Sequence, residues 1–181
     1  MTNEIKGYLN QIKGNEKLEN YLSVECDFEL ADELQLKDDL EFLLEASRAN
    51  YDIEAFACDG AGGIYALLDD KYVGYIDSEG QAGIVGNSVR SFFSILLNCG
   101  YISDYAKFEV LESKELFLQY YSELELPRED DYVIQFIENN DLENDPEKIF
   151  MLFKESVMTS PKLEIKADND DYEDSEQLFN L

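Results

Sequence analysis

Seven of the ten glycines in this chain lie between residues 57 and 88, where a glycine-rich loop could bind phosphate through its backbone amides. A P-loop requires the pattern GxxxxGK[ST], which does not occur. The dinucleotide pattern GxGxxG requires a helix directly after it, but GAGGIY leads into a strand-like run. We therefore interpret these glycines as turn and bulge residues. Asp59 before Gly60 fits a turn in which its carboxylate accepts hydrogen bonds from nearby backbone amides.

Carboxylates also occur at spacings that could support chemistry. Asp69, Asp70, Asp77 and Glu79 lie on adjacent predicted turns, which would allow them to cluster. Two carboxyls at a defined separation in a cleft could cleave a glycosidic bond, and an enzyme of this kind would lose turnover on Glu79→Gln. With 41 acidic residues, however, close pairs arise by chance. Solvated turns or a binding edge are the favoured interpretation, and with Tyr72 these residues form the predicted partner-binding set.

Other catalytic and metal chemistries lack the residues they need. The chain has no His, so Ser-His and Cys-His nucleophiles are excluded. Its three cysteines are widely spaced without a CxxC motif, which excludes a Cys/His zinc site and indicates reduced, buried thiols. The acidic run DNDDYEDSEQ lacks the glycine of a calcium loop. We therefore expect no cofactor, no metal and no enzymatic activity.

The charge restricts the possible partners. The formal net charge is -27, from 41 acidic and 14 basic residues. Phosphate backbones and anionic membranes would be repelled, so we expect neither nucleic-acid nor membrane binding. A basic protein would be attracted and steered toward the chain. The first ten residues do not resemble a signal peptide and no apolar run approaches a membrane span, so we expect a cytoplasmic protein.

Hydrophobic periodicity indicates the elements that hold these residues. We expect helices around residues 5–12, 36–50, 89–99, 116–124, 132–137 and 146–157, with Ser88 as an N-cap. Short runs between residues 53 and 86 predict an antiparallel meander of three or four strands. VECDFEL and KLEIK predict further extended segments. The predicted class is α+β, with a central antiparallel, possibly mixed, sheet, flanking helices and a helical C-terminal third. We expect one domain over 1–166 and a mobile acidic tail over 167–181.

Several of these residues carry a resemblance to a known family. DGAGGIYALLDD, followed by VGYIDSEGQAGIVGNSVRSFFSILLNC, resembles the core signature of the SUKH (Smi/Knr-like) superfamily. The resemblance covers about residues 30–165, although the Leu-Pro that usually precedes the first helix of the family is absent, because Lys37 follows Leu36. The matching turn and strand residues, to which the resemblance gives a structural role, are Asp59, Gly60, Gly62, Gly63, Gly74, Gly80 and Gly83.

The resemblance implies a function. Many bacterial members of this superfamily are immunity proteins (antitoxins), which bind and neutralise a cognate toxin, often a nuclease. Others are regulatory scaffolds without a toxin partner, and members are non-enzymatic as a rule. A nuclease carries basic residues around its phosphate-binding cleft, which suits an acidic inhibitor. The resemblance therefore implies an immunity protein with a basic toxin partner, with a regulatory scaffold as the alternative. Tyr65, Tyr72, Tyr75, Tyr101 and Tyr105 are candidate aromatic anchors, and core packing is equally compatible with each.

Overall fold

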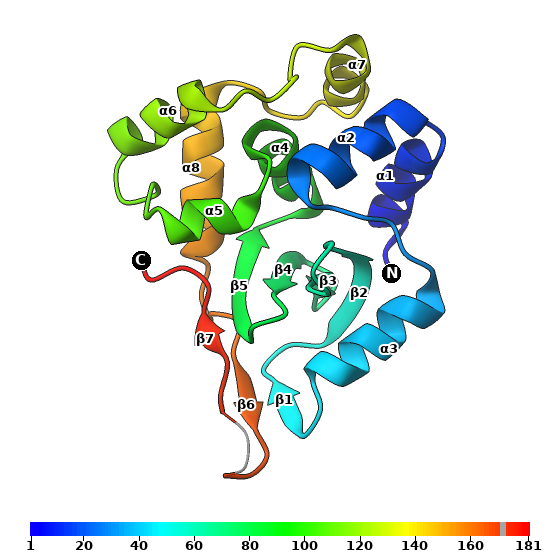
Figure 1. The fold of residues 1–181 in the computed structure, drawn as a ribbon, viewed down its shortest axis with the longest axis vertical. Coiled ribbons are helices and arrows are strands. Elements are labelled where there is room, and N and C mark those ends of the chain that lie inside the picture. Colours follow the sequence, from blue (N-terminus) through cyan, green and yellow to red (C-terminus); the bar gives the residue numbers. More distant parts are fainter. Residues whose placement is uncertain (171–172) are drawn as a thin grey trace.

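The computed structural model describes residues 1–170 and 173–181, which form an α+β fold (Figure 1). The helices in chain order are α1 Asn3–Lys13, α2 Glu16–Cys26, α3 Glu33–Leu43, α4 Val89–Cys99, α5 Ile102–Lys107, α6 Lys114–Glu123, α7 Asp131–Asn139 and α8 Pro146–Val157. The strands are β1 Ser47–Ala49, β2 Ile53–Cys58, β3 Ile64–Leu68, β4 Tyr72–Ile76, β5 Gln81–Gly86, β6 Ile165–Ala167 and β7 Glu176–Gln177.

The central sheet has the order β2-β3-β4-β5-β7. Strands β2 to β5 form the predicted antiparallel meander, because aromatic and β-branched runs alternate with tight turns. Strand β7 joins the edge of β5 in parallel, so the sheet is mixed. A second, two-stranded antiparallel sheet pairs β1 with β6.

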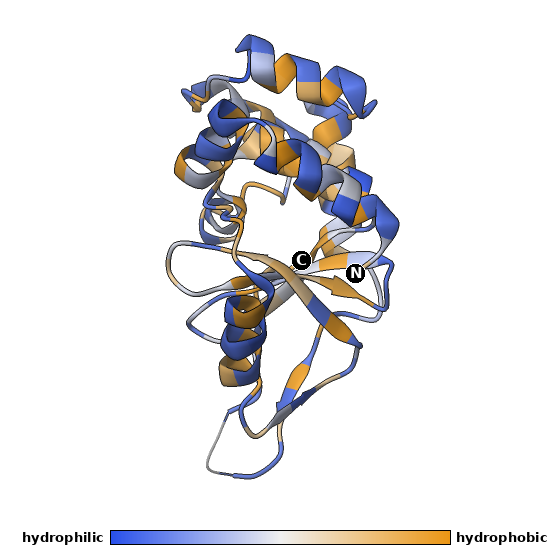
Figure 2. Ribbon diagram, turned by 90° about the vertical axis from the view of Figure 1, so that its right-hand side faces the viewer, coloured by the Kyte–Doolittle hydropathy of each residue, from blue (hydrophilic) through white to orange (hydrophobic). Residues whose placement is uncertain are grey.

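Both faces of the central sheet are buried. Alternate residues of β3 point to opposite faces: Tyr65 and Leu67 join the larger core cluster, while Leu68 joins the smaller one. A thick layer of helices covers the first face, and α3 covers part of the second (Figure 2). The predicted apolar stripe of α3, which includes Leu40 and Leu43, packs into the smaller cluster.

Helix α4 lies at the centre of the helical layer. Ser88 caps it as predicted, and Ser88 and Ser91 form a reciprocal capping box. The sequence predicts one apolar face, but Ser94 and Asn98 are buried as well. Their polarity is satisfied internally, since Asn98 Nδ2 donates to the carbonyls of Ser94 (2.8 Å) and Glu143 (3.1 Å).

Two segments differ from the sequence-based expectation. Val24–Cys26, expected to be extended, completes α2, because Asn15 caps this helix and Leu18, Tyr21 and Leu22 give it a buried face. Asp27 then adopts a left-handed conformation, and strand-like pairing in this segment is an isolated bridge between Glu29 and Cys58. Helix α3 ends at Leu43 rather than near Asn50, and β1 follows. The short helix α5 has no counterpart among the predicted elements.

The C-terminal segment departs from the expected mobile tail. Residues 176–177 form β7, and the Leu178 N–H donates to the Ala82 carbonyl (2.9 Å). Leu178 and Phe179 are both 6% exposed and belong to the main core. Polarity predicted solvation, but these two apolar residues anchor the end of the chain against β5 and α8. Residues 171–172 of the expected tail lie outside the described residues.

Candidate acidic binding site

The predicted partner-binding residues do not form one cluster. Asp69 and Asp70 form the β3–β4 turn beside Tyr72, whereas Asp77 and Glu79 lie in the β4–β5 turn. These turns are at opposite ends of β4, which are roughly 17 Å apart at about 3.4 Å per strand residue. The four carboxylates therefore do not cluster, although their predicted turns allowed it, because consecutive turns of a meander alternate between the two ends of its sheet. No catalytic pair can span this separation.

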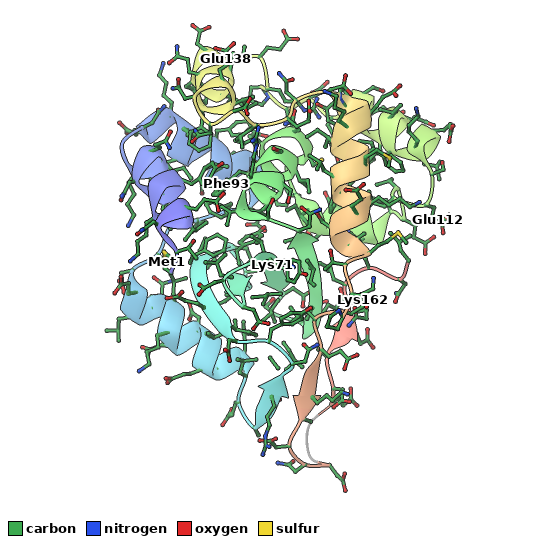
Figure 3. All side chains as sticks on the ribbon, turned by 180° about the vertical axis from the view of Figure 1, so that it is seen from behind. Met1, Lys71, Phe93, Glu112, Glu138 and Lys162 are labelled. Carbon is green, nitrogen blue, oxygen red and sulfur yellow. The ribbon has the colours of Figure 1, made fainter. Side chains whose placement is uncertain are left out.

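The β3–β4 turn is held by local contacts. Asp69 and Asp70 both have positive φ, 51° and 56°, as the two central residues of a type I′ turn do, and the Lys71 N–H donates to the Leu68 carbonyl (3.0 Å) to close it. The Asp69 carboxylate accepts from the backbone N–H of Asp52 (2.9 Å), and Asp70 is exposed. Tyr72 is half-buried and packs edge-on against Tyr51. Lys71, labelled in Figure 3, follows Asp70 in this turn.

The β4–β5 turn uses one of its carboxylates structurally. Asp77 accepts from the backbone N–H groups of Glu79 (2.9 Å) and Gln81 (2.8 Å). Gly80 has φ 89°, a conformation that favours glycine. Glu79 is exposed. Asp77 is thus committed to holding the turn, which leaves Glu79 free to face a partner.

The β2–β3 turn is organised by Asp59, which is 5% exposed. Its carboxylate accepts from the N–H groups of Ala61 (2.8 Å) and Gly63 (2.7 Å) and from the Tyr75 hydroxyl. A Cβ on Gly63 would lie 2.3 Å from the carboxylate, so only glycine fits there. Of the other glycines expected to be structural, Gly60 and Gly62 lie in this turn and Gly80 lies in the β4–β5 turn. Gly74 lies in β4 and Gly83 in β5.

The end of α2 contacts this turn. Asp27 ends the helix in a left-handed conformation, φ 50° and ψ 47°, and its carboxylate accepts from the Gly60 N–H (2.9 Å). Burial raises the pKa of Asp27; the Gly60 hydrogen bond lowers it, and the nearby Asp59 and Glu29 charges raise it further, so the net shift is upward. The partly exposed carboxylate of Asp27 is thus held close to the buried carboxylate of Asp59.

An exposed aromatic residue lies beside these acids. Tyr101 precedes α5, is 40% exposed, and donates from its hydroxyl to the Val24 carbonyl on α2 (3.3 Å). Val24 is 55% exposed. The end of α2 and the start of α5 meet near the centre of Figure 1. Burial and the charges of Asp27, Glu25 and Asp104 raise the pKa of Tyr101.

We call this surface the acidic edge, comprising Val24, Glu25, Asp27, Glu29, Tyr101 and Asp104. Residues 18–36 and 91–106, which supply these side chains, contain no Lys or Arg, whereas Lys107 at the exposed end of α5 lies three residues beyond Asp104. The nearby Arg128 points inward: it stacks over the Tyr121 ring at 4.0 Å and donates to the Asn98 carbonyl (2.7 Å). The acidic edge therefore presents an excess of negative charge, four carboxylates with Lys107 as the nearby Lys, around an exposed aromatic side chain.

Sequence reasoning finds only part of this site. Tyr101 is one of five candidate aromatic anchors; of the others, Tyr65, Tyr75 and Tyr105 are buried and Tyr72 is half-buried. Glu25, Asp27 and Glu29 fall in a segment that the sequence predicts to be extended, and not in a predicted site. The absence of basic residues from 18–36 is the available signal, but its meaning depends on the contact between Asp27 and the distant Gly60 turn.

The described residues were also compared with the requirements of a metal site, a reactive thiol and a membrane-spanning helix. No group of three or more potential ligands there is positioned to hold a metal ion. All three cysteines are buried and unpaired, and burial raises the pKa of Cys58 to about 11, which opposes thiolate chemistry. No described helix has the length and apolarity needed to cross a bilayer. Comparisons with protein-family models, curated proteins and solved structures find no match to this chain.

Proposed function

We propose that this chain is an immunity protein that binds a basic toxin through the acidic edge and thereby neutralises it. The observation that carries the proposal is an exposed Tyr101 beside the carboxylates of Glu25, Asp27 and Asp104. The resemblance of residues 56–99 to SUKH immunity proteins points in the same direction. The toxin would be neutralised in the cytoplasm of the cell that makes it.

The charged and the apolar residues of the acidic edge would contribute to binding in different ways. The acidic residues raise the rate of association with a basic partner, and this acceleration decreases as salt is added. Tyr101 and Val24 supply the apolar anchor, because aromatic side chains near the centre of an interface contribute most to its affinity. For a nuclease toxin, occupation of the phosphate-binding cleft by these acids would block the substrate.

The test begins with capture of partners on the tagged chain at low salt, elution with a salt gradient and identification by mass spectrometry. We expect a basic toxin domain whose activity is inhibited at one-to-one stoichiometry. Tyr101→Ala should weaken inhibition at least tenfold, as expected for an interface hot spot. Phe42→Ala is the matched control, since Phe42 is 75% exposed on α3, beyond the acidic edge.

Two outcomes would contradict the proposal. Capture of several signalling proteins without any protective effect would favour the regulatory scaffold. Inhibition that Tyr101→Ala and Phe42→Ala weaken equally would show that the toxin binds elsewhere on the chain.

A further inference from the structure

The outer edge of β2 is a second surface that the proposed function does not use. Strand β2 is the first strand of the central sheet and pairs only with β3 within it. Among the described residues, the other backbone partner of β2 is Glu29, which forms an isolated bridge with Cys58 through two hydrogen bonds of 2.8 and 3.0 Å. The first half of β2 therefore has a free edge.

The register shows which backbone groups face outward. The Asp69 N–H donates to the Asp52 carbonyl (3.0 Å), and the next pairs are Ile53↔Leu68, Glu54↔Leu67 and Ala55↔Ala66. Hydrogen-bonded and non-hydrogen-bonded pairs alternate in an antiparallel ladder. Ile53 and Ala55 thus direct their N–H and C=O groups away from β3, as a template for another strand.

A groove runs along this edge, and we call it the β2-edge groove. Its first part, about 300 Å³, lies between the start of the chain, β2 and α3. Leu36, Leu40, Ile53 and Ala55 line it, together with Met1 and the charged residues Lys6, Glu33, Lys37 and Glu54. Figure 3 shows Met1 at this place, beside α3 and the edge strand. Apolar side chains thus flank the exposed backbone groups.

The second part of the groove, about 490 Å³, shares Ile53 and Glu54 with the first part. It is also lined by Asp52, Leu67, Asp69 and Asp70, so it extends over β3 to the β3–β4 turn. No Lys or Arg lines this part. The amino group of Met1 already forms an ion pair with Glu54. The groove therefore passes from a part that holds apolar side chains and charges of both signs to an acidic part at the β3–β4 turn.

We propose that the β2-edge groove binds an extended basic peptide segment, which adds to β2 as a further strand. Its backbone would pair with Ile53 and Ala55, an apolar side chain would contact Leu36 and Leu40, and a Lys or Arg would lie beside Asp52 and Asp70. A second copy of the chain is a poorer occupant, because each copy carries a net charge of -27. This inference is independent of toxin neutralisation, since the groove and the acidic edge have no residue in common.

The probe is an acetylated, amidated peptide of about seven residues, a common strand length, that alternates Val and Lys. Nuclear magnetic resonance titration of the ¹⁵N-labelled chain should move the amide signals of Ile53, Glu54 and Ala55. A peptide of the same sequence and charge, N-methylated at alternate residues, should bind at least fivefold more weakly, because it cannot complete the backbone pairing.

Variants of the chain test the same two features. Ala55→Pro removes an outward N–H without removing a bond to β3, and should weaken peptide binding by about fivefold. The double variant Asp52→Asn with Asp70→Asn should weaken binding by about five- to tenfold, as expected for two exposed ion pairs. Its matched control is Glu138→Gln with Glu155→Gln on the exposed faces of α7 and α8, where binding should change less than twofold.

Three results would overturn the inference. The N-methylated peptide could bind as tightly as the parent, which would show that binding depends on charge attraction alone and not on backbone pairing with β2. The shifted signals could map to the acidic edge and not to β2. Sedimentation could reveal a dimer that the peptide dissociates, which would make a second copy the occupant. If Ala55→Pro fails to fold, as judged by circular dichroism, the charge variants still decide the outcome.

Discussion

At the residue scale, Asp27 couples stability to the proposed binding. Burial raises its pKa in the folded state, so the folded chain binds a proton more readily than the unfolded chain. The contribution of Asp27 to the free energy of unfolding therefore rises as the pH falls from neutral through the raised pKa. At neutral pH the ionised carboxylate lowers the free energy of unfolding. A charge kept at such a cost is typical of binding surfaces.

We accordingly expect Asp27→Asn to raise the urea midpoint at pH 7, as Asn retains an oxygen for the Gly60 N–H and tolerates the left-handed conformation. The difference between variant and parent should vanish below the ordinary carboxyl pKa of 3.8, where both side chains are neutral. The same variant should weaken partner capture. A midpoint that falls at neutral pH would show that the charge itself stabilises the fold.

Two glycines should respond to alanine with opposite signs. A Cβ on Gly63 would lie 2.3 Å from the Asp59 carboxylate, so Gly63→Ala should cost about 2 kcal/mol or more. Gly7 lies inside α1 with nothing within 4 Å of its Cβ position, so Gly7→Ala should gain about 0.5–1 kcal/mol. Chemical denaturation of both variants measures the two changes in the free energy of unfolding. Equal effects would contradict the role of Asp59 as organiser of the turn.

At the scale of elements, the C-terminal segment acts as part of the core. Phe179 stacks edge-on against Phe153 of α8, with ring centroids 5.6 Å apart, and Leu178 touches the Cβ position of Gly83 at 3.0 Å. The segment thereby covers the β5 edge of the sheet and leaves β2 as the edge open to partners.

Phe179→Ala should therefore cost about 3–5 kcal/mol, the usual effect of removing a buried aromatic ring. Leu181→Ala, at the exposed end of the same segment, should change stability by less than about 0.5 kcal/mol. Thermal unfolding of the two variants gives the comparison. Equally small effects would mean that the segment is a solvated tail after all.

At the scale of the whole molecule, the net charge of -27 opposes compaction through self-repulsion. The seven ion pairs of the described residues are few beside 41 acidic side chains. Added salt screens the remaining repulsion, with a Debye length of about 10 Å at about 0.1 M. Stability and partner binding should therefore respond to salt in opposite directions.

We expect the melting temperature to rise by several degrees between low and moderate sodium chloride, while affinity for a basic partner falls over the same range. Differential scanning calorimetry and titration calorimetry measure the two quantities on one sample. Sodium sulfate at matched ionic strength is the control for ion-specific effects, which act through surface exclusion. A melting temperature that falls with salt would show that attractive pairs dominate the charge balance.

The local sequence determined much of this fold. The runs between residues 53 and 86 predicted β2 to β5, since alternation and tight turns depend only on near neighbours. Ser88 and the apolar spacing after it predicted α4, and Pro146 after Asp145 predicted the start of α8. The acidic charge and the absence of His likewise restrict the chemistry that the side chains can perform, because composition does not depend on how the chain folds.

The tertiary structure decided what lies together. The acidic edge depends on Asp27 meeting Gly60 and on Tyr101 meeting Val24, contacts between residues 33 and 77 positions apart. The two acidic turns of the meander, close in sequence, separate because β4 runs the depth of the sheet between them. The end of the chain joins the core through only Leu178 and Phe179, a signal too short for periodicity to reveal. Spacing along a chain reports local geometry, whereas a binding surface is assembled by packing between distant elements.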